Sequence, residues 1–228
     1  MPVLARRATA EIFGTFTLVF FGCGVVVMDS FPGARFGLMG IALVHAVALS
    51  VAVSATMGIS GGHLNPAVTV GLLAARRISP ADAGVYVVSQ LAGALFAVAV
   101  VKWLMPASVG ELVTWGTPTL NPLVTFTRGI ATEGLLTFFL MSAVMGTAVA
   151  RNAPRIGGFG IGMTLLFAIM VGGPLTGAAL NPARAFAPAL LSGNMTAQVV
   201  YWVGPMLGAV IAAIVWDRVL LAGERVAD

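Results

Sequence analysis

The chain has very few charged side chains, which make up 9% of its 228 residues, whereas hydrophobic residues make up 59%. Soluble domains carry about a quarter charged residues, so this composition excludes an ordinary soluble protein. Two histidines, one cysteine and eight acidic residues are scattered along the sequence without the clustering that a metal site or a catalytic triad needs. We therefore expect no enzyme, no bound metal and no other cofactor.

Long apolar runs replace the missing charge, and about twenty apolar residues suffice for a helix to cross a bilayer. Six runs meet this requirement, at about 8–28, 36–57, 82–104, 129–149, 157–175 and 197–221. Two shorter runs, about 66–75 and 182–191, are too short to span and suit re-entrant half-helices. The first run also resembles a signal peptide. It lacks a clear cleavage site and leads into further spans, so we expect a retained helix.

The few basic residues are unevenly placed, and basic residues in loops set the orientation of a membrane protein. If both termini are cytoplasmic, only Arg35, Lys102 and Arg128 lie outside. The residues that then lie inside are Arg6, Arg7, Arg76, Arg77, Arg151, Arg155, Arg218 and Arg225. The sequence therefore predicts a multi-pass integral protein of the cell (inner) membrane, surrounded by lipid, with cytoplasmic termini. The net charge of +4 reflects this topology, so no nucleic-acid partner is expected.

The tripeptide Asn-Pro-Ala occurs twice, as Asn65-Pro66-Ala67 and as Asn181-Pro182-Ala183, and each copy opens one of the short apolar runs. Asparagine is a good N-cap, and proline suits the first helical position, where its missing N–H is not needed. Each copy therefore predicts a helix that begins inside the membrane. Such a helix points bare N–H groups and a positive dipole end at whatever lies there. This pattern predicts a pore.

The chain also repeats itself. Glu11-x-x-x-Thr15-Phe16-x-Leu18 in the first run recurs as Glu133-x-x-x-Thr137-Phe138-x-Leu140 in the fourth. Each half contains three full spans, an odd number, so the second half must be inverted, and inverted repeats place their functional site at the midplane. We expect an all-α membrane protein with six transmembrane helices and two half-helices. Residues 1–228 would form one channel domain with repeats at about 8–104 and 129–221, joined by an exposed loop, 105–128.

With these features the chain resembles the aquaporin (major intrinsic protein) family over essentially its whole length. The resemblance rests on the six spans, both Asn-Pro-Ala boxes, the intramembrane glutamates and Arg184 after the second box. It implies a homotetramer in which each subunit holds its own pore, and it implies that Asn65 and Asn181 donate hydrogen bonds to a passing solute. Backbone carbonyls would accept hydrogen bonds from the solute, at Gly61, Gly62 and His63 and at Gly177, Ala178 and Ala179.

Glu11 and Glu133 are costly inside a membrane unless they are paired. One interpretation of these carboxylates is a proton relay. The resemblance implies instead that each supports the re-entrant loop of its own half, and we favour this because the two occupy equivalent positions in the repeat.

In the family, four positions form a constriction outside the midplane, and here they are His45, Ile169, Ala178 and Arg184. The topology also allows these residues to meet at one level near the outer side. A fixed guanidinium donates to neutral solutes and repels cations. The structural alternatives are an arginine anchored to nearby carbonyls and a packed histidine bonded to a carbonyl.

The four residues depart from the narrow water-selective pattern, which has Phe in place of His45 and His in place of Ile169. They resemble the filters of plant vacuolar aquaporins and their ammonia-permeable animal relatives. We expect a passive channel for water and small neutral solutes such as ammonia or hydrogen peroxide, closed to protons and ions. A glycerol-type facilitator is the nearest alternative, although Ala185 stands where that branch usually has Asp. A secondary transporter would need an ion-coupling residue, and the only acids within the membrane are the two symmetric glutamates.

Overall fold

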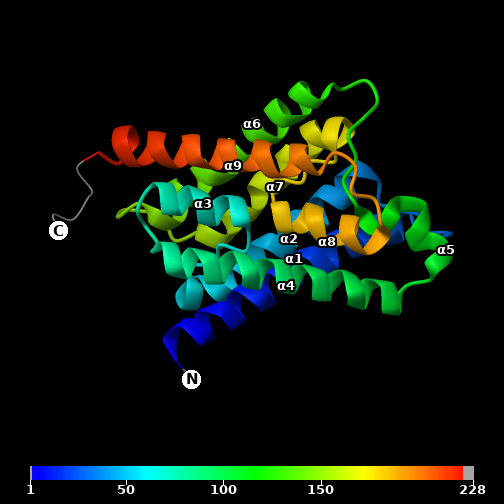
Figure 1. Cartoon of the computed structure of the whole chain (residues 1–228), viewed down its shortest axis with the longest axis horizontal. Helices are drawn as coiled ribbons and strands as arrows, with labels where there is room; N and C mark the ends of the chain where they lie inside the picture. The colour runs from blue at the N-terminus through cyan, green and yellow to red at the C-terminus, as the bar shows by residue number, and fades with distance from the viewer. Residues whose placement is uncertain (1, 223–228) are drawn as a thin grey trace.

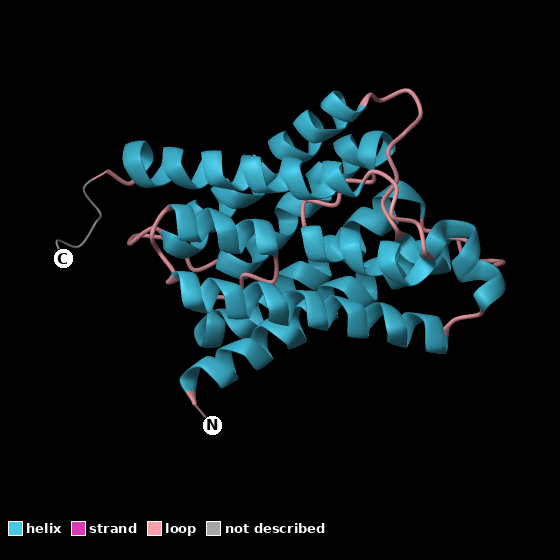
Figure 2. Ribbon diagram, viewed as in Figure 1, coloured by secondary structure: helices cyan, strands magenta, loops and turns pink. Residues whose placement is uncertain are grey.

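The computed structural model describes residues 2–222, and the elements in that range are all helices (Figure 2). Six of them are long and apolar enough to cross a membrane: α1 (Val3–Asp29), α2 (Gly37–Ser60), α4 (Pro80–Leu104), α6 (Phe126–Val144), α7 (Gly157–Thr176) and α9 (Gln198–Val215). Short π-helical turns extend two of these spans, η2 (Met145–Val149) after α6 and η3 (Trp216–Leu220) after α9. The two half-helices are α3 (Pro66–Ala74) and α8 (Pro182–Ser192).

The predicted fold class is thus confirmed, and each observed span lies within about five residues of its predicted bounds once η2 and η3 are counted with α6 and α9. Arg225, one of the basic residues used to predict the orientation, lies outside the described residues. Figure 1 shows the beginning of α1 and the end of η3 at the same end of the bundle, with α3 and α8 between the long helices.

Helix contacts in one half recur in the other. α1 packs against α2 and α4, and α6 packs against α7 and α9 in the same way. α2 and α7 join the halves, and each half-helix also packs against the last span of the opposite half, α3 against α9 and α8 against α4. The two repeats therefore form one bundle around the half-helices, as an inverted repeat requires.

Small residues allow these spans to approach closely. A Cβ atom on Gly208 of α9 would overlap the backbone of Gly134 in α6, and one on Gly162 of α7 would overlap Ser50 of α2. Gly93 of α4 lies equally close to the backbone of α1. Close approach at small residues replaces the hydrophobic effect as the main source of packing energy between membrane helices.

The connection between the halves differs from the exposed loop predicted for residues 105–128. It contains α5 (Ala107–Gly110) and η1 (Glu111–Gly116), and residues 115–118 are buried. Trp115 is only 3% exposed because it packs into a cluster with Cys23 of α1 and Val101 of α4. The proline and glycine content of the segment correctly indicated turns, but it did not indicate that a tryptophan would fasten one turn to the bundle.

Two buried glutamates hold the re-entrant loops that precede the half-helices. Glu11 accepts hydrogen bonds from the backbone N–H groups of His63 (3.0 Å) and Leu64 (2.7 Å) and from the hydroxyl of Ser60 (2.6 Å). The same arrangement recurs on Glu133, with the Ala179 N–H (3.0 Å), the Leu180 N–H (2.8 Å) and the Thr176 hydroxyl (2.6 Å). Each carboxylate thus accepts hydrogen bonds from loop N–H groups that have no helical carbonyl as a partner.

The loop backbone needs this support because it is unusual. Leu64 and Leu180 have φ values of 51° and 54°, in the left-handed region that residues with a Cβ rarely occupy. Such conformations persist where the surroundings determine them from several sides. The contacts of both carboxylates are therefore those of a structural support, which favours this interpretation over a proton relay.

We predict that Gly208→Ala destabilises the protein by about 1–3 kcal/mol, because the added methyl group would force α9 away from the Gly134 backbone. The matched control is Gly84→Ala on α4, where a Cβ meets nothing within 4 Å. The control should be neutral or slightly stabilising, since alanine is the better helix former. The thermal midpoint of the purified protein in detergent measures both effects. Equal midpoints for the two variants would contradict the packing argument.

We predict that Glu133→Gln lowers the free energy of unfolding by about 1–3 kcal/mol. The amide NH₂ group of glutamine would face the Thr176 hydroxyl or the Leu180 N–H, which now donate hydrogen bonds to the carboxylate. Water permeability should fall with stability, because the loop that carries the second box loses its support. Glu111→Gln, an exposed carboxylate in η1, serves as the control and should change neither property. A proton relay predicts a different result, in which stability is unchanged and only proton-coupled flux is lost.

Candidate pore and selectivity filter

Asn65 and Asn181 cap the two half-helices, as the tripeptides predict. The side-chain oxygen of Asn65 accepts from the Ala67 N–H (2.8 Å), and that of Asn181 accepts from the Ala183 N–H (3.0 Å). Both side chains are almost fully buried. Each oxygen is therefore committed to its own helix, which leaves the NH₂ group of each amide for other partners.

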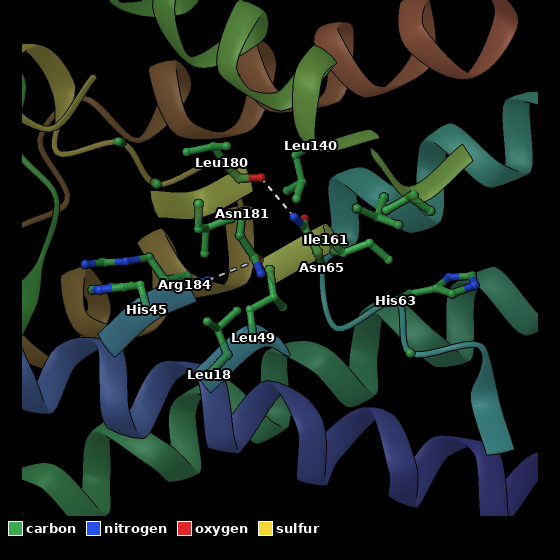
Figure 3. Close-up of a pocket in the computed structure, with 16 residues that line it drawn as sticks. Leu18, His45, Leu49, His63, Asn65, Leu140, Ile161, Leu180, Asn181 and Arg184 are labelled. Atoms are coloured by element: carbon green, nitrogen blue, oxygen red, sulfur yellow. Dashed lines mark hydrogen bonds between the residues drawn. The ribbon is translucent and has the colours of Figure 1, made fainter. Parts of the chain in front are cut away.

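The amide NH₂ groups join the two halves. Asn65 Nδ2 donates to the Leu180 carbonyl (2.9 Å), and Asn181 Nδ2 donates to the Leu64 carbonyl (2.9 Å). Figure 3 shows both asparagines in the middle of the cavity that they line. Since an amide carries two N–H donors, one on each asparagine remains for a molecule in the cavity.

The half-helices present their N-terminal ends to each other at this point, because α3 begins at Pro66 and α8 begins at Pro182. A helix N-terminus carries the equivalent of about half a positive charge, and a low-dielectric surrounding strengthens its field. Two such ends meeting in one cavity favour neutral or electron-rich groups and repel cations.

The backbone carbonyls of each re-entrant loop face the cavity, and the glutamate of that half lies on the other side of the loop. The N–H groups of residues 62–64 all point toward Ser60 or Glu11. Because the C=O of a trans peptide is antiparallel to its N–H, the carbonyls of Gly61, Gly62 and His63 must point away from the carboxylate. In the second half, the carbonyls of Gly177, Ala178 and Ala179 follow from the bonds of residues 178–180 by the same argument.

The cavity system has three parts that share lining residues. A central segment of about 20 Å³ lies between a part of about 170 Å³ and a part of about 590 Å³, which we call the outer part and the inner part after the orientation predicted from the basic residues. Gly62, His63, Ala178 and Ala179 line the central segment, Gly61 lines the inner part and Gly177 the outer part. The central volume is close to the space that a single water molecule needs, so solutes must pass in single file.

The four predicted filter residues gather where the outer part meets the central segment. His45 and Arg184 line both cavities, and Figure 3 shows their side chains next to each other at one end of the central segment. Ile169 lines the outer side of this junction, and Ala178 lines the central side. The structure therefore brings together residues from α2, α7, α8 and the second re-entrant loop.

The polar groups at this junction are held in place by backbone carbonyls. His45 Nδ1 lies 2.9 Å from the Ile41 carbonyl, and because a carbonyl can only accept, Nδ1 carries the hydrogen. The Nε2 atom of a neutral ring is then an acceptor. Arg184 Nη1 donates to the Gly116 carbonyl (2.7 Å), whereas its Nε is buried without a partner in residues 2–222. The junction thus offers both donors and an acceptor to a neutral molecule.

His63 marks the opposite end of the central segment, where this segment meets the inner part. The sequence suggested that it would act mainly through its backbone. The ring is also fixed, because Nδ1 lies 3.1 Å from the Thr69 hydroxyl and the ring meets Tyr86 edge-on at 4.9 Å. His63 therefore contributes both a carbonyl and an imidazole edge to the pathway.

The central segment also has a wall of large apolar side chains that was not predicted, which consists of Leu18, Leu49, Val68, Leu140, Val144, Ile161, Leu165 and Leu180. Helical spacing could have found part of it, since Leu49 lies one turn after His45 and Leu165 one turn before Ile169. Apolar walls give a dehydrated ion no substitute for its water shell. They therefore favour passage of molecules that need few hydrogen bonds.

Comparison with known proteins agrees with this architecture. A family description, Major intrinsic protein, matches residues 2–216. The chain is 38% identical to Aquaporin TIP4-4 of Zea mays, over 95% of this chain and 87% of that protein. It is 35% identical to Nodulin-26 of Glycine max, over 94% of this chain and 78% of that protein.

A similar fold is also known in a solved structure, that of the aquaglyceroporin from Plasmodium falciparum. It matches with a TM-score of 0.86 and 24% sequence identity, over 95% of this chain and 97% of that one. The likeness to that protein shows the shared fold, and the family match extends over almost the entire described chain. The chain therefore belongs to the major intrinsic protein family, the aquaporins, whose members are passive membrane channels.

Proposed function

We propose that this channel conducts water and small neutral solutes such as ammonia and hydrogen peroxide, and that it excludes protons and ions. One observation carries the proposal. His45 and Arg184 lie together at the junction between the outer part and a central segment of only about 20 Å³. Every solute must pass this junction, so its chemistry sets the selectivity.

Exclusion of cations follows from fixed positive charge along a narrow path. The Arg184 guanidinium repels cations at the outer junction, and the two helix N-terminal ends repel them at the midplane. The spare N–H groups of Asn65 and Asn181 donate to the same midplane site, so a water molecule there accepts hydrogen bonds and directs its own hydrogens outward. A water molecule held in that orientation cannot accept a hydrogen bond from a neighbouring water, so a proton cannot be transferred through it along a chain of waters.

Passage of ammonia and peroxide follows from the residues that frame the junction. The four residues at the constriction, His45, Ile169, Ala178 and Arg184, include no Phe, Tyr or Trp, so no large aromatic ring narrows it. Ammonia can accept from the guanidinium and donate to the Nε2 atom of a neutral His45 or to a carbonyl. Hydrogen peroxide has the same two capabilities and resembles water in its demand for hydrogen bonds.

Glycerol-type transport and coupled transport are the competing functions. A narrow central segment disfavours a three-carbon solute, and Ala185 does not match the aspartate typical of glycerol facilitators. A coupled transporter needs a titratable group in the pathway. Glu11 and Glu133 are instead fully buried and bonded to the loops behind the pore.

The assembly and orientation of the channel are part of the same proposal. The cross-pore bonds of Asn65 and Asn181 make each half incomplete alone, which supports a single channel domain. Apolar side chains exposed on the outer faces of α2 and α7 suit lipid or the neighbouring subunits of a homotetramer; they include Leu43, Val47, Val51, Phe159 and Phe167. The basic residues support cytoplasmic termini, and we place the channel in the cell (inner) membrane.

We predict that proteoliposomes containing the protein take up ammonia, and alkalinise internally, several-fold faster than protein-free vesicles. Water and peroxide fluxes should rise as well, whereas glycerol flux should stay near the lipid background. Stopped-flow swelling and an internal pH dye measure these fluxes side by side. Fast water flux without faster alkalinisation would contradict the ammonia assignment, and saturating or proton-coupled flux would support a carrier.

We predict that the double substitution His45→Phe/Ile169→His narrows the profile toward water, because it places an aromatic ring in the constriction and moves the imidazole across it. The ratio of ammonia to water permeability should fall several-fold. The control is Val47→Phe/Val171→His, which introduces the same side chains at exposed positions of the same helices. An unchanged ratio in the first variant would show that the filter lies elsewhere.

A further inference from the structure

The guanidinium of Arg184 depends on a single carbonyl outside its own half-helix. Its Nη1 donates to Gly116 (2.7 Å), and this is its only hydrogen bond to the protein within residues 2–222. Arginine is a long, flexible side chain, so one bond fixes it only if the acceptor itself is immobile. The position of Gly116 therefore decides where the guanidinium lies.

Gly116 ends a turn of unusual shape. Thr114, Trp115 and Gly116 have successive φ values of 44°, 56° and 83°, so three consecutive residues lie in the left-handed region. A Cβ on Gly116 would come within 2.9 Å of the Cys23 backbone in α1, so only glycine lets this part of the turn pack so closely against α1. Such a run of disfavoured conformations requires contacts that hold it from outside.

Trp115 supplies one such contact. Its ring is buried in the cluster formed by α1, α4 and α8, which includes Cys23, Val101 and Ala187. Gly110 packs against the face of the same ring so closely that no side chain would fit between them. A tryptophan ring held in this way leaves its own backbone, and the next carbonyl, little freedom.

Lys102 ties the same ring to the half-helix that carries Arg184. Its Nζ lies 5.1 Å from the centre of the Trp115 ring and donates to the Leu191 carbonyl (2.7 Å) near the C-terminal end of α8. A cation is favoured over the face of an indole ring and at a helix C-terminus. One ammonium group therefore couples the turn to α8.

We propose that Trp115 and Lys102 are positioning residues for selectivity, which fix the Arg184 guanidinium at the constriction through the Gly116 carbonyl. This inference rests on the filter role of Arg184 in the proposed function. Neither side chain lines the junction, so neither contacts a passing solute. Removing the anchor leaves every filter residue in the chain but gives the guanidinium freedom to move, and larger neutral solutes such as urea then pass more easily.

The test compares the ratio of urea to water permeability in proteoliposomes for Trp115→Ala, Trp115→Phe and Trp103→Ala. Trp115→Ala should raise the ratio several-fold. Trp115→Phe should keep the ratio close to that of the unchanged protein, because a ring still fills the site beneath Lys102. Trp103 is next to Lys102 in sequence but 82% exposed, so Trp103→Ala should leave the ratio unchanged. An unchanged ratio in Trp115→Ala would overturn the proposal.

A second arm separates positioning from a general loss of structure. Arg184→Val should itself raise the urea ratio, and adding Trp115→Ala in that background should raise it no further, because the group being positioned is gone. An equally large effect in both backgrounds would overturn the inference. If Arg184→Val leaves the ratio unchanged, the proposed filter role fails instead.

If Trp115→Ala folds poorly, it will lose monodispersity in detergent. A further variant then keeps the proposal testable. Lys102→Met keeps the apolar stem of an exposed side chain and removes the ammonium group that links the Trp115 ring to α8. It should give a smaller rise in the urea ratio that again disappears in the Arg184→Val background. No rise in the ratio would overturn the proposal.

Discussion

Backbone polar groups inside a membrane must find partners within the protein, and this constraint shapes the whole centre of the molecule. Two re-entrant loops each lead into a half-helix that begins inside the bundle, which exposes loop N–H groups and helix ends that ordinary transmembrane helices do not expose. The protein meets the demand with a buried carboxylate behind each loop and an asparagine in front of it. The carboxylate takes the N–H groups, so the loop carbonyls turn toward the cavity. The pore lining is thus a consequence of how the loops are satisfied.

The same scaffold occurs twice, and function arises where the two copies differ. Val68 and Arg184 occupy equivalent first-turn positions in α3 and α8, yet Val68 is apolar and Arg184 is the only arginine among residues 2–222 that lines the central segment. Gln90 bonds Glu11 in the first half, whereas the equivalent position in the second half is Pro205. Symmetric support makes a path through the membrane, and in the proposed function the unmatched arginine places the selective step on one side of it.

Features that depend on short-range chemistry could be predicted from the sequence. The Asn-Pro-Ala boxes specify helix starts through capping, the apolar runs specify spans through length, and the repeated glutamates specify the halves. The four filter positions came from the family resemblance, and the structure brings them to one junction. The support of Arg184 was not predictable, because Gly116 and Lys102 bond residues of α8 that lie 68 and 89 positions further along the chain. Composition alone made that segment look like an exposed loop.

The unequal volumes of the two vestibules show why this hidden support matters. The inner part, about 590 Å³, is lined by a mixture of polar and apolar side chains, whereas the outer part holds only about 170 Å³. Discrimination between molecules of nearly equal size needs groups fixed to within a fraction of their van der Waals radius. A guanidinium on a flexible stem meets this requirement only when its acceptor is rigid. The buried tryptophan turn therefore belongs to the selectivity mechanism as much as the residues that a solute touches.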